Sequence, residues 1–126
     1  MLKTQKRPVF LNLLLIKLPV AGIMSIGHRI AGVLLFFSLP LWLYLLQLSL
    51  ESEQGFSQVQ AWLSGPLVKL LLFLLLWATV HHLLAGIRYL LLDIDIGIDK
   101  PVYKNTARAV LFAAPIISLL ILGVSL

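Results

Sequence analysis

Residues 66–92 read PLVKLLLFLLLWATVHHLLAGIRYLLL, and only Lys69 and Arg88 in this stretch carry a full charge at neutral pH. An α-helix rises about 1.5 Å per residue, so about 20 apolar residues cross a hydrocarbon core roughly 30 Å thick. The stretch is longer than this and almost uncharged. It is therefore predicted to be a transmembrane helix.

Two further stretches are long and apolar enough to span a bilayer, at about 19–50 and 106–126. The 126-residue sequence is 60% hydrophobic and 12% charged, whereas about 25% of the residues of a typical soluble domain are charged. The first apolar run is too long for a signal peptide and no small-residue cleavage site follows it, so we expect this helix to be retained. The prediction is a single all-α domain over 1–126, with three transmembrane helices in an up-down-up bundle surrounded by membrane lipid.

The basic residues lie at one end of this predicted bundle. The first connector has no Lys or Arg, whereas the chain before the first helix and the second connector region carry Lys3, Lys6, Arg7, Lys17, Arg88, Lys100, Lys104 and Arg108. Cytoplasmic loops of membrane proteins carry an excess of Lys and Arg. The N-terminus and the second connector are therefore predicted to be cytoplasmic, and the first connector and the C-terminus to lie outside.

Several classes of function are excluded by composition. The sequence has no cysteine, so this chain has no disulfide framework, thiolate-bound zinc, iron–sulfur cluster or cysteine nucleophile. Its basic residues do not gather on a polar face of the kind that binds nucleic acid, so no nucleic-acid partner is expected. Asp93, Asp95 and Asp99 lack the twelve-residue pattern of a calcium loop and are predicted to form a solvated turn.

Polar and ionisable residues occur within the first predicted span, where such side chains are costly and are candidates for function. Ser25 precedes His28 by three residues and Arg29 by four, so the three are expected to share one helical face. Their hydroxyl, imidazole and guanidinium groups predict a polar pocket near the cytoplasmic side of the membrane. A hydrogen-bonded patch between helices is the alternative interpretation.

The second span carries two adjacent histidines. His81 and His82 lie about 100° apart around the helix, so they are not expected to face one partner together. His82 lies about 11 residues, or about 16 Å, from Asp93 at the cytoplasmic boundary, and Gly86 leaves space on its face for a flat macrocycle. Haem ligation and a hydrogen-bonded structural role both fit His82. Arg88, about one turn from the cytoplasmic end, is expected to extend its side chain to the interface.

Four motifs occur in a fixed order along residues 7–93: R-P at 7–8, a proline at 19, S-x-x-H-R-x-x-G at 25–32 and H-x-x-x-G-I-R-x-x-x-x-D at 82–93. Together they resemble the cytochrome b membrane-anchor subunit, the larger C-type anchor, of succinate dehydrogenase (succinate:quinone oxidoreductase). The three predicted spans and the cytoplasmic N-terminus are also similar to that subunit.

The resemblance implies a role for each matching residue. His82 would be one axial ligand of a haem b iron, with the second ligand supplied by a smaller anchor subunit. Ser25 and Arg29 would help to form the ubiquinone pocket, and His28 and Arg29 would lie near the haem propionates. Tyr89 departs from the His or Phe that is frequent in the family, and His81 is an additional histidine, but only His82 has the family's spacing to Gly86.

The resemblance also implies partners and a location. Succinate oxidation and the iron–sulfur relay would belong to a flavoprotein subunit and an iron–sulfur subunit, so this chain would be no enzyme on its own. Electrons would reach ubiquinone at the cytoplasmic face of a bacterial inner membrane.

Three alternatives remain at this point. The first is the anchor of a quinol:fumarate reductase, and the second, from another class, is a three-helix structural or pore-forming protein without haem. The third is a self-contained cytochrome in which His28 and His82 ligate one iron. We disfavour the third because helix geometry places His28 about 9 Å deep and His82 about 16 Å deep.

Overall fold

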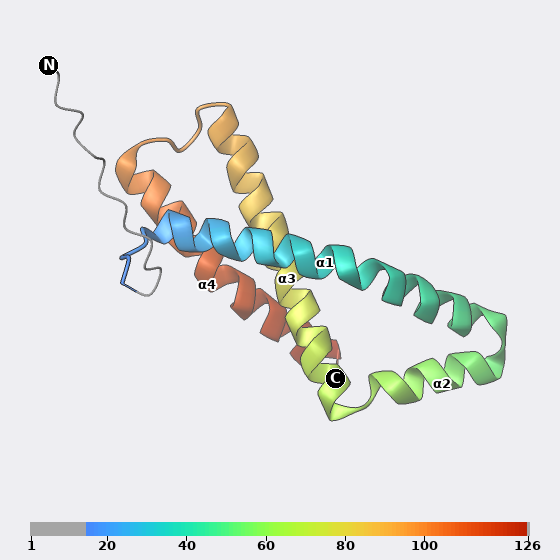
Figure 1. The fold of residues 1–126 in the computed structure, drawn as a ribbon. Helices are drawn as coiled ribbons and strands as arrows, with labels where there is room; N and C mark the ends of the chain where they lie inside the picture. The colour runs from blue at the N-terminus through green and yellow to red at the C-terminus, as the bar shows by residue number, and fades with distance from the viewer. Residues whose placement is uncertain (1–14, 126) are drawn as a thin grey trace, which may run out of the picture.

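A computed structural model describes residues 15–125, which form four helices and no strand (Figure 1). The helices are α1 (Val20–Glu51), α2 (Glu53–Leu63), α3 (Pro66–Asp93) and α4 (Lys100–Ser125). Of these, α1, α3 and α4 are long and apolar enough to cross a membrane. The prediction of an all-α protein with three membrane-spanning segments is confirmed.

The ends of the long helices follow from prolines and from one turn. Pro19 precedes α1 in an extended conformation, and Pro66 is the first residue of α3, where a proline is favoured because its missing N–H needs no partner. The chain leaves α3 through a turn with positive φ angles of 61° at Asp95 and 82° at Gly97. This turn contains the aspartates that were predicted to lie in a solvated turn, and Asp93, Asp95 and Asp99 are all exposed.

The helix α4 begins earlier than the predicted third span, at Lys100 rather than at about residue 106. The amide of Tyr103 donates to the carbonyl of Asp99 at 2.8 Å, which closes the first turn. Pro101 is compatible with this position because the first amides of a helix have no partner within it. The polar first turns extend beyond the apolar run and could not be found from hydropathy.

The first connector contains a helix that was not predicted. In α2, the hydroxyl of Ser52 accepts a hydrogen bond of 3.0 Å from the amide of Gly55, which caps the helix at its start. Gly55 and Val59 are buried, and a side chain at Gly55 would collide with the carbonyl of Leu48 in α1. The close approach of α2 to the end of α1 therefore depends on a glycine.

The helix α1 crosses α3, while α4 packs against both, and the C-terminal half of α1 extends away from the other two helices toward α2 (Figure 1). A core cluster of Met24, Ala85, Ala107 and Val110 joins the three long helices near the turn between α3 and α4. Small residues at such contacts allow helix backbones to approach closely in a membrane protein. This packing brings residues 24–32 of α1 against the two histidines of α3.

Candidate functional site

The two adjacent histidines of α3 both contact α1. His81 Nε2 lies 3.3 Å from the carbonyl oxygen of Met24, and His82 Nδ1 lies 3.2 Å from that of His28. The prediction that neighbouring histidines would not face one partner is wrong. The helices cross at this point, so the two rings reach backbone carbonyls that lie one turn apart on α1.

Glycines provide the space for these contacts. A methyl group at Gly27 would lie 2.8 Å from His81 Nε2, and one at Gly32 would lie 3.0 Å from His82 Cε1. The first separation is shorter than any normal contact of a side-chain carbon and the second is very tight. Both glycines are therefore needed for the imidazoles to approach α1 as they do.

The hydrogen bond of His82 determines which nitrogen is available for a ligand. A carbonyl oxygen can only accept, so Nδ1 of His82 carries the hydrogen and Nε2 of the neutral ring keeps its lone pair. No group among residues 15–125 forms a hydrogen bond with this Nε2, and the side chain is only half-buried. A histidine that ligates a metal typically donates its other N–H to a carbonyl or carboxylate in this manner.

His28 lies beside His82. Their rings stack with centroids 4.0 Å apart and an angle of 12° between the planes, and the Tyr89 ring meets His28 edge-on at 5.3 Å. The predicted difference in depth between His28 and His82 is therefore wrong, because the crossing of α1 and α3 places the rings at one level. Stacked rings leave no room for a porphyrin between them, which gives a different reason against a haem ligated by both. Gly86 lies next to His28, whose Nε2 would be 3.9 Å from a methyl group there.

His81 is enclosed within the bundle. Its side chain is fully buried, and the Trp77 ring lies 5.3 Å from it on the same helix. Its Nε2 is used by the Met24 carbonyl, whereas its Nδ1 is buried without a partner among the described residues. The ring has no access to a large ligand from outside the chain.

Ser25 and Arg29 form a pair on α1. The Arg29 guanidinium donates from Nη2 to the Ser25 hydroxyl at 3.2 Å, as their spacing of four residues predicts. Arg29 is exposed and borders a surface hollow of about 250 Å³ that Ile30, Val33 and Leu34 also line. Among the described residues, the His28 side chain forms no hydrogen bond with either of them, and its ring lies against α3. The three polar side chains predicted to share one pocket are therefore divided between two contacts.

Arg88 was predicted to extend its side chain to the membrane interface, but it is buried between α3 and α4. Its side chain is only 5% exposed, and it donates from Nε to the Thr106 hydroxyl and from Nη2 to the Tyr103 carbonyl, both at 3.0 Å. Its guanidinium also lies 4.5 Å from the centre of the Tyr103 ring. The prediction failed because α4 begins at Lys100, which places Tyr103 and Thr106 opposite Arg88. The arginine connects α3 to α4 at this end of the bundle.

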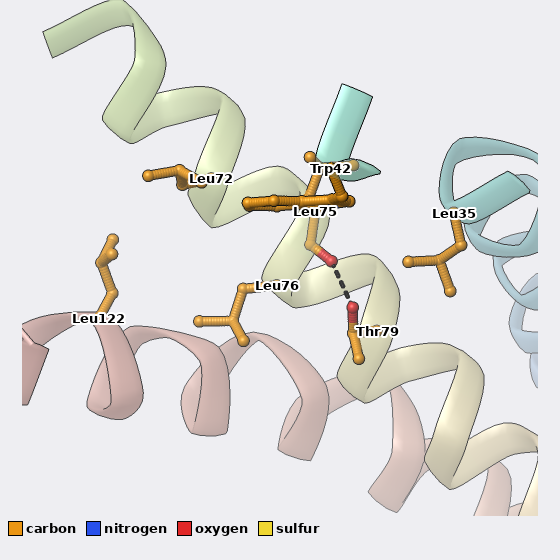
Figure 2. A pocket seen from close by; sticks show the side chains of 7 residues that line it. All are labelled: Leu35, Trp42, Leu72, Leu75, Leu76, Thr79 and Leu122. Atoms are coloured by element: carbon orange, nitrogen blue, oxygen red, sulfur yellow. Dashed lines mark hydrogen bonds between the residues drawn. The ribbon is translucent and has the colours of Figure 1, made fainter. Parts of the chain in front are cut away.

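None of these polar residues lines a larger hollow of about 320 Å³ (Figure 2). The residues that line it are Leu35, Trp42, Leu72, Leu75, Leu76, Thr79 and Leu122. The Thr79 hydroxyl donates to the Leu75 carbonyl at 2.9 Å, so its hydrogen is not available to a ligand. The hollow contains none of the ionisable residues of the predicted pocket and suits an apolar chain.

Among residues 15–125, no group of three or more His, Asp or Glu side chains could hold a bare metal ion. A single histidine with a free Nε2 instead suits a metal that brings most of its ligands with it, as haem iron does. The family profile described as succinate dehydrogenase/fumarate reductase transmembrane subunit matches residues 3–121. The chain belongs to this family.

The similarity to relatives in this family extends over nearly the whole chain. A protein of Coxiella burnetii is 38% identical over 120 residues, which cover 94% of this chain and 95% of the relative. Proteins of Paracoccus denitrificans and Rickettsia felis are each 29% identical to this chain. The matched region covers 92% of this chain in both comparisons, and it covers 89% of the Paracoccus protein and 90% of the Rickettsia protein. All three are named succinate dehydrogenase cytochrome b556 subunit. The resemblance drawn from the motifs is confirmed.

Sequence reasoning missed several contacts of this family member. Tyr103 and Thr106 were not predicted as partners of Arg88, and the carbonyl groups of Met24 and His28 carry no signal in their side chains. The available signal was Gly27 and Gly32, because two glycines within an apolar helix indicate a close approach of another group.

Proposed function

We propose that the chain is a membrane-anchor subunit of succinate dehydrogenase that helps to bind haem b and ubiquinone. The observation that carries the proposal is the hydrogen bond from His82 Nδ1 to the His28 carbonyl, which leaves Nε2 of this half-buried ring without a partner among the residues that the structure describes. Family membership and relatives named as cytochrome b556 subunits support the same function. The named relatives favour succinate dehydrogenase over fumarate reductase as the parent complex.

His82 would hold the haem iron through Nε2. The backbone of His28 fixes the ring, and Gly32 leaves space beside it. His81 is enclosed and His28 is stacked on His82, so a smaller anchor subunit is proposed to supply the second histidine that would hold the iron. When bound, the haem supplies one-electron transfer between the iron–sulfur relay and quinone.

Ser25 and Arg29 would bind ubiquinone. The Ser25 hydroxyl accepts a hydrogen bond from Arg29 and can donate its own hydrogen to a quinone oxygen, while the guanidinium stabilises negative charge that develops there. Arg29 is exposed on a membrane-spanning helix, where contact with lipid is costly. A neighbouring subunit is therefore proposed to cover it and to complete the pocket. Arg29 would also pair with a haem propionate, with His28 nearby.

The remaining parts of the reaction are proposed to lie in other chains. This sequence has no cysteine to hold iron–sulfur clusters, so a flavoprotein subunit would oxidise succinate and an iron–sulfur subunit would carry the electrons. These subunits would dock at the cytoplasmic face of a bacterial inner membrane. The chain would then provide the membrane attachment and part of the quinone and haem sites.

Purification tests this function directly. A complex isolated from membranes through a tag on this chain is expected to contain succinate dehydrogenase activity and b-type haem, which a reduced-minus-oxidised spectrum and pyridine-haem analysis detect. In a strain that lacks the chain, dye-linked succinate oxidation should move to the soluble fraction and quinone reduction should be lost. Full quinone reduction by a membrane complex without this chain would contradict the proposal.

The proposed orientation is tested with fusions. The basic residues at one end of the bundle, including Lys104 and Arg108 beside the start of α1, predict that this end is cytoplasmic. Alkaline phosphatase fused after Leu126 should be active, and the same enzyme fused after Lys100 should be inactive. The reverse pattern would place the proposed quinone pocket on the outer side and contradict the orientation.

A further inference from the structure

His81 has no part in the proposed function, yet it is among the most constrained side chains of the chain. It is fully buried, and its Nε2 donates a hydrogen bond of 3.3 Å to the Met24 carbonyl. Its Nδ1 is buried and, within residues 15–125, has no partner. A buried polar atom without a partner is destabilising. The hydrogen bond made by Nε2 is an interaction with α1 that an apolar side chain at this position could not make.

The contacts of His81 and His82 together determine how α1 lies against α3. Their acceptors, the carbonyls of Met24 and His28, lie one turn apart on α1. A shift of α1 by one residue would move each carbonyl by about 1.5 Å along the helix axis and turn it by about 100°. Neither hydrogen bond would survive such a shift. The pair of bonds therefore defines both the register and the rotation of α1.

We propose that His81 is a positioning residue for the haem ligand. By holding the Met24 carbonyl, it keeps α1 where the His28 carbonyl can orient the His82 ring. The inference rests on the proposed ligation of haem by His82. The partner of a ligating histidine's second nitrogen fixes the ring orientation and raises its basicity, so His81 acts on the haem through α1 without touching it.

Two amide substitutions distinguish the hydrogen bond from simple packing. The terminal amide nitrogen of Gln reaches about as far as histidine Nε2, whereas that of Asn reaches only about as far as Nδ1. His81→Gln is expected to retain the bond to Met24, and His81→Asn to lose it. In the purified complex, the Asn variant should have a shifted haem midpoint potential and a changed ferric EPR spectrum, whose g values respond to the angle between the axial imidazoles. Loss of one hydrogen bond should also release haem about two- to tenfold faster on warming.

A second pair of variants tests the same contact from α1. In Gly27→Ala, the new methyl group would lie 2.8 Å from His81 Nε2 and displace the ring, whereas Gly123 in α4 has nothing within 4 Å of an added methyl group. We expect Gly27→Ala to reproduce the EPR and potential changes of His81→Asn. Gly123→Ala should match the wild type.

The outcomes test the positioning role of His81 separately from the proposed ligation of haem by His82. Wild-type potentials and EPR spectra in both His81→Asn and Gly27→Ala would overturn the positioning role, and so would equal changes in His81→Gln and His81→Asn. If the Asn variant does not assemble, the comparison of Gly27→Ala with Gly123→Ala decides. Haem retained in His82→Ala would instead overturn the proposed ligation, which separates the two failures.

Discussion

The His82→Ala complex is expected to contain at most about one tenth of the wild-type haem b. This substitution would remove an imidazole proposed to hold the iron. Loss of only the hydrogen-bond partner of a ligating histidine typically costs tenfold or more in metal affinity, so loss of the ligand itself should cost at least as much. Nothing else among the described residues replaces it, because the rings of His28 and His81 are stacked or enclosed. Pyridine-haem analysis of the purified complex, normalised to its protein content, measures the effect.

The matched control is His81→Ala. His81 is adjacent in sequence and more deeply buried than His82, so its truncation should disturb packing at least as much. It should nevertheless leave most of the haem in place, since its ring does not face a ligand. Loss of haem in His81→Ala together with its retention in His82→Ala would show that the ligand had been assigned to the wrong histidine.

The parts of this fold that depend on local sequence were predictable. Long apolar runs specify the three spans, because the thickness of a bilayer sets the length of helix that crosses it. The pairing of Ser25 with Arg29 follows from a spacing of four residues on one helix, and the hydrogen bond between them confirms it. The helix α2 was missed because only one short stripe of it, at Gly55 and Val59, is buried.

The contacts that depend on how helices cross were not predictable. Depths counted along single helices placed His28 and His82 at different levels, whereas the crossing of α1 and α3 stacks their rings at 4.0 Å. The same limitation affected Arg88, whose hydrogen-bond partners Tyr103 and Thr106 lie at the polar start of α4. Periodicity within a helix describes which residues share a face, but not which part of another helix that face meets.

The Arg29→Leu variant is expected to reduce ubiquinone about ten- to a thousandfold more slowly than the wild type. It removes the guanidinium proposed to stabilise charge on the quinone, and it leaves the Ser25 hydroxyl without its partner at 3.2 Å. Ser25→Ala removes a single hydrogen bond and should cost only about three- to tenfold. Succinate oxidation with an artificial dye, which takes electrons from the soluble subunits, should remain unchanged in both variants.

Controls separate a quinone-binding role from a packing role. Lys69→Leu removes a cation from the start of α3, and Ser49→Ala removes a hydroxyl that donates to the Leu46 carbonyl near the other end of α1. Both variants should reduce quinone normally.

Haem content must be measured in the same preparations, since Arg29 is also proposed to pair with a haem propionate. If quinone and dye activities fall together, Arg29 stabilises the assembly and does not bind quinone, because detachment of the soluble subunits affects both. Wild-type quinone turnover in a fully assembled Arg29→Leu complex would remove this residue from the site.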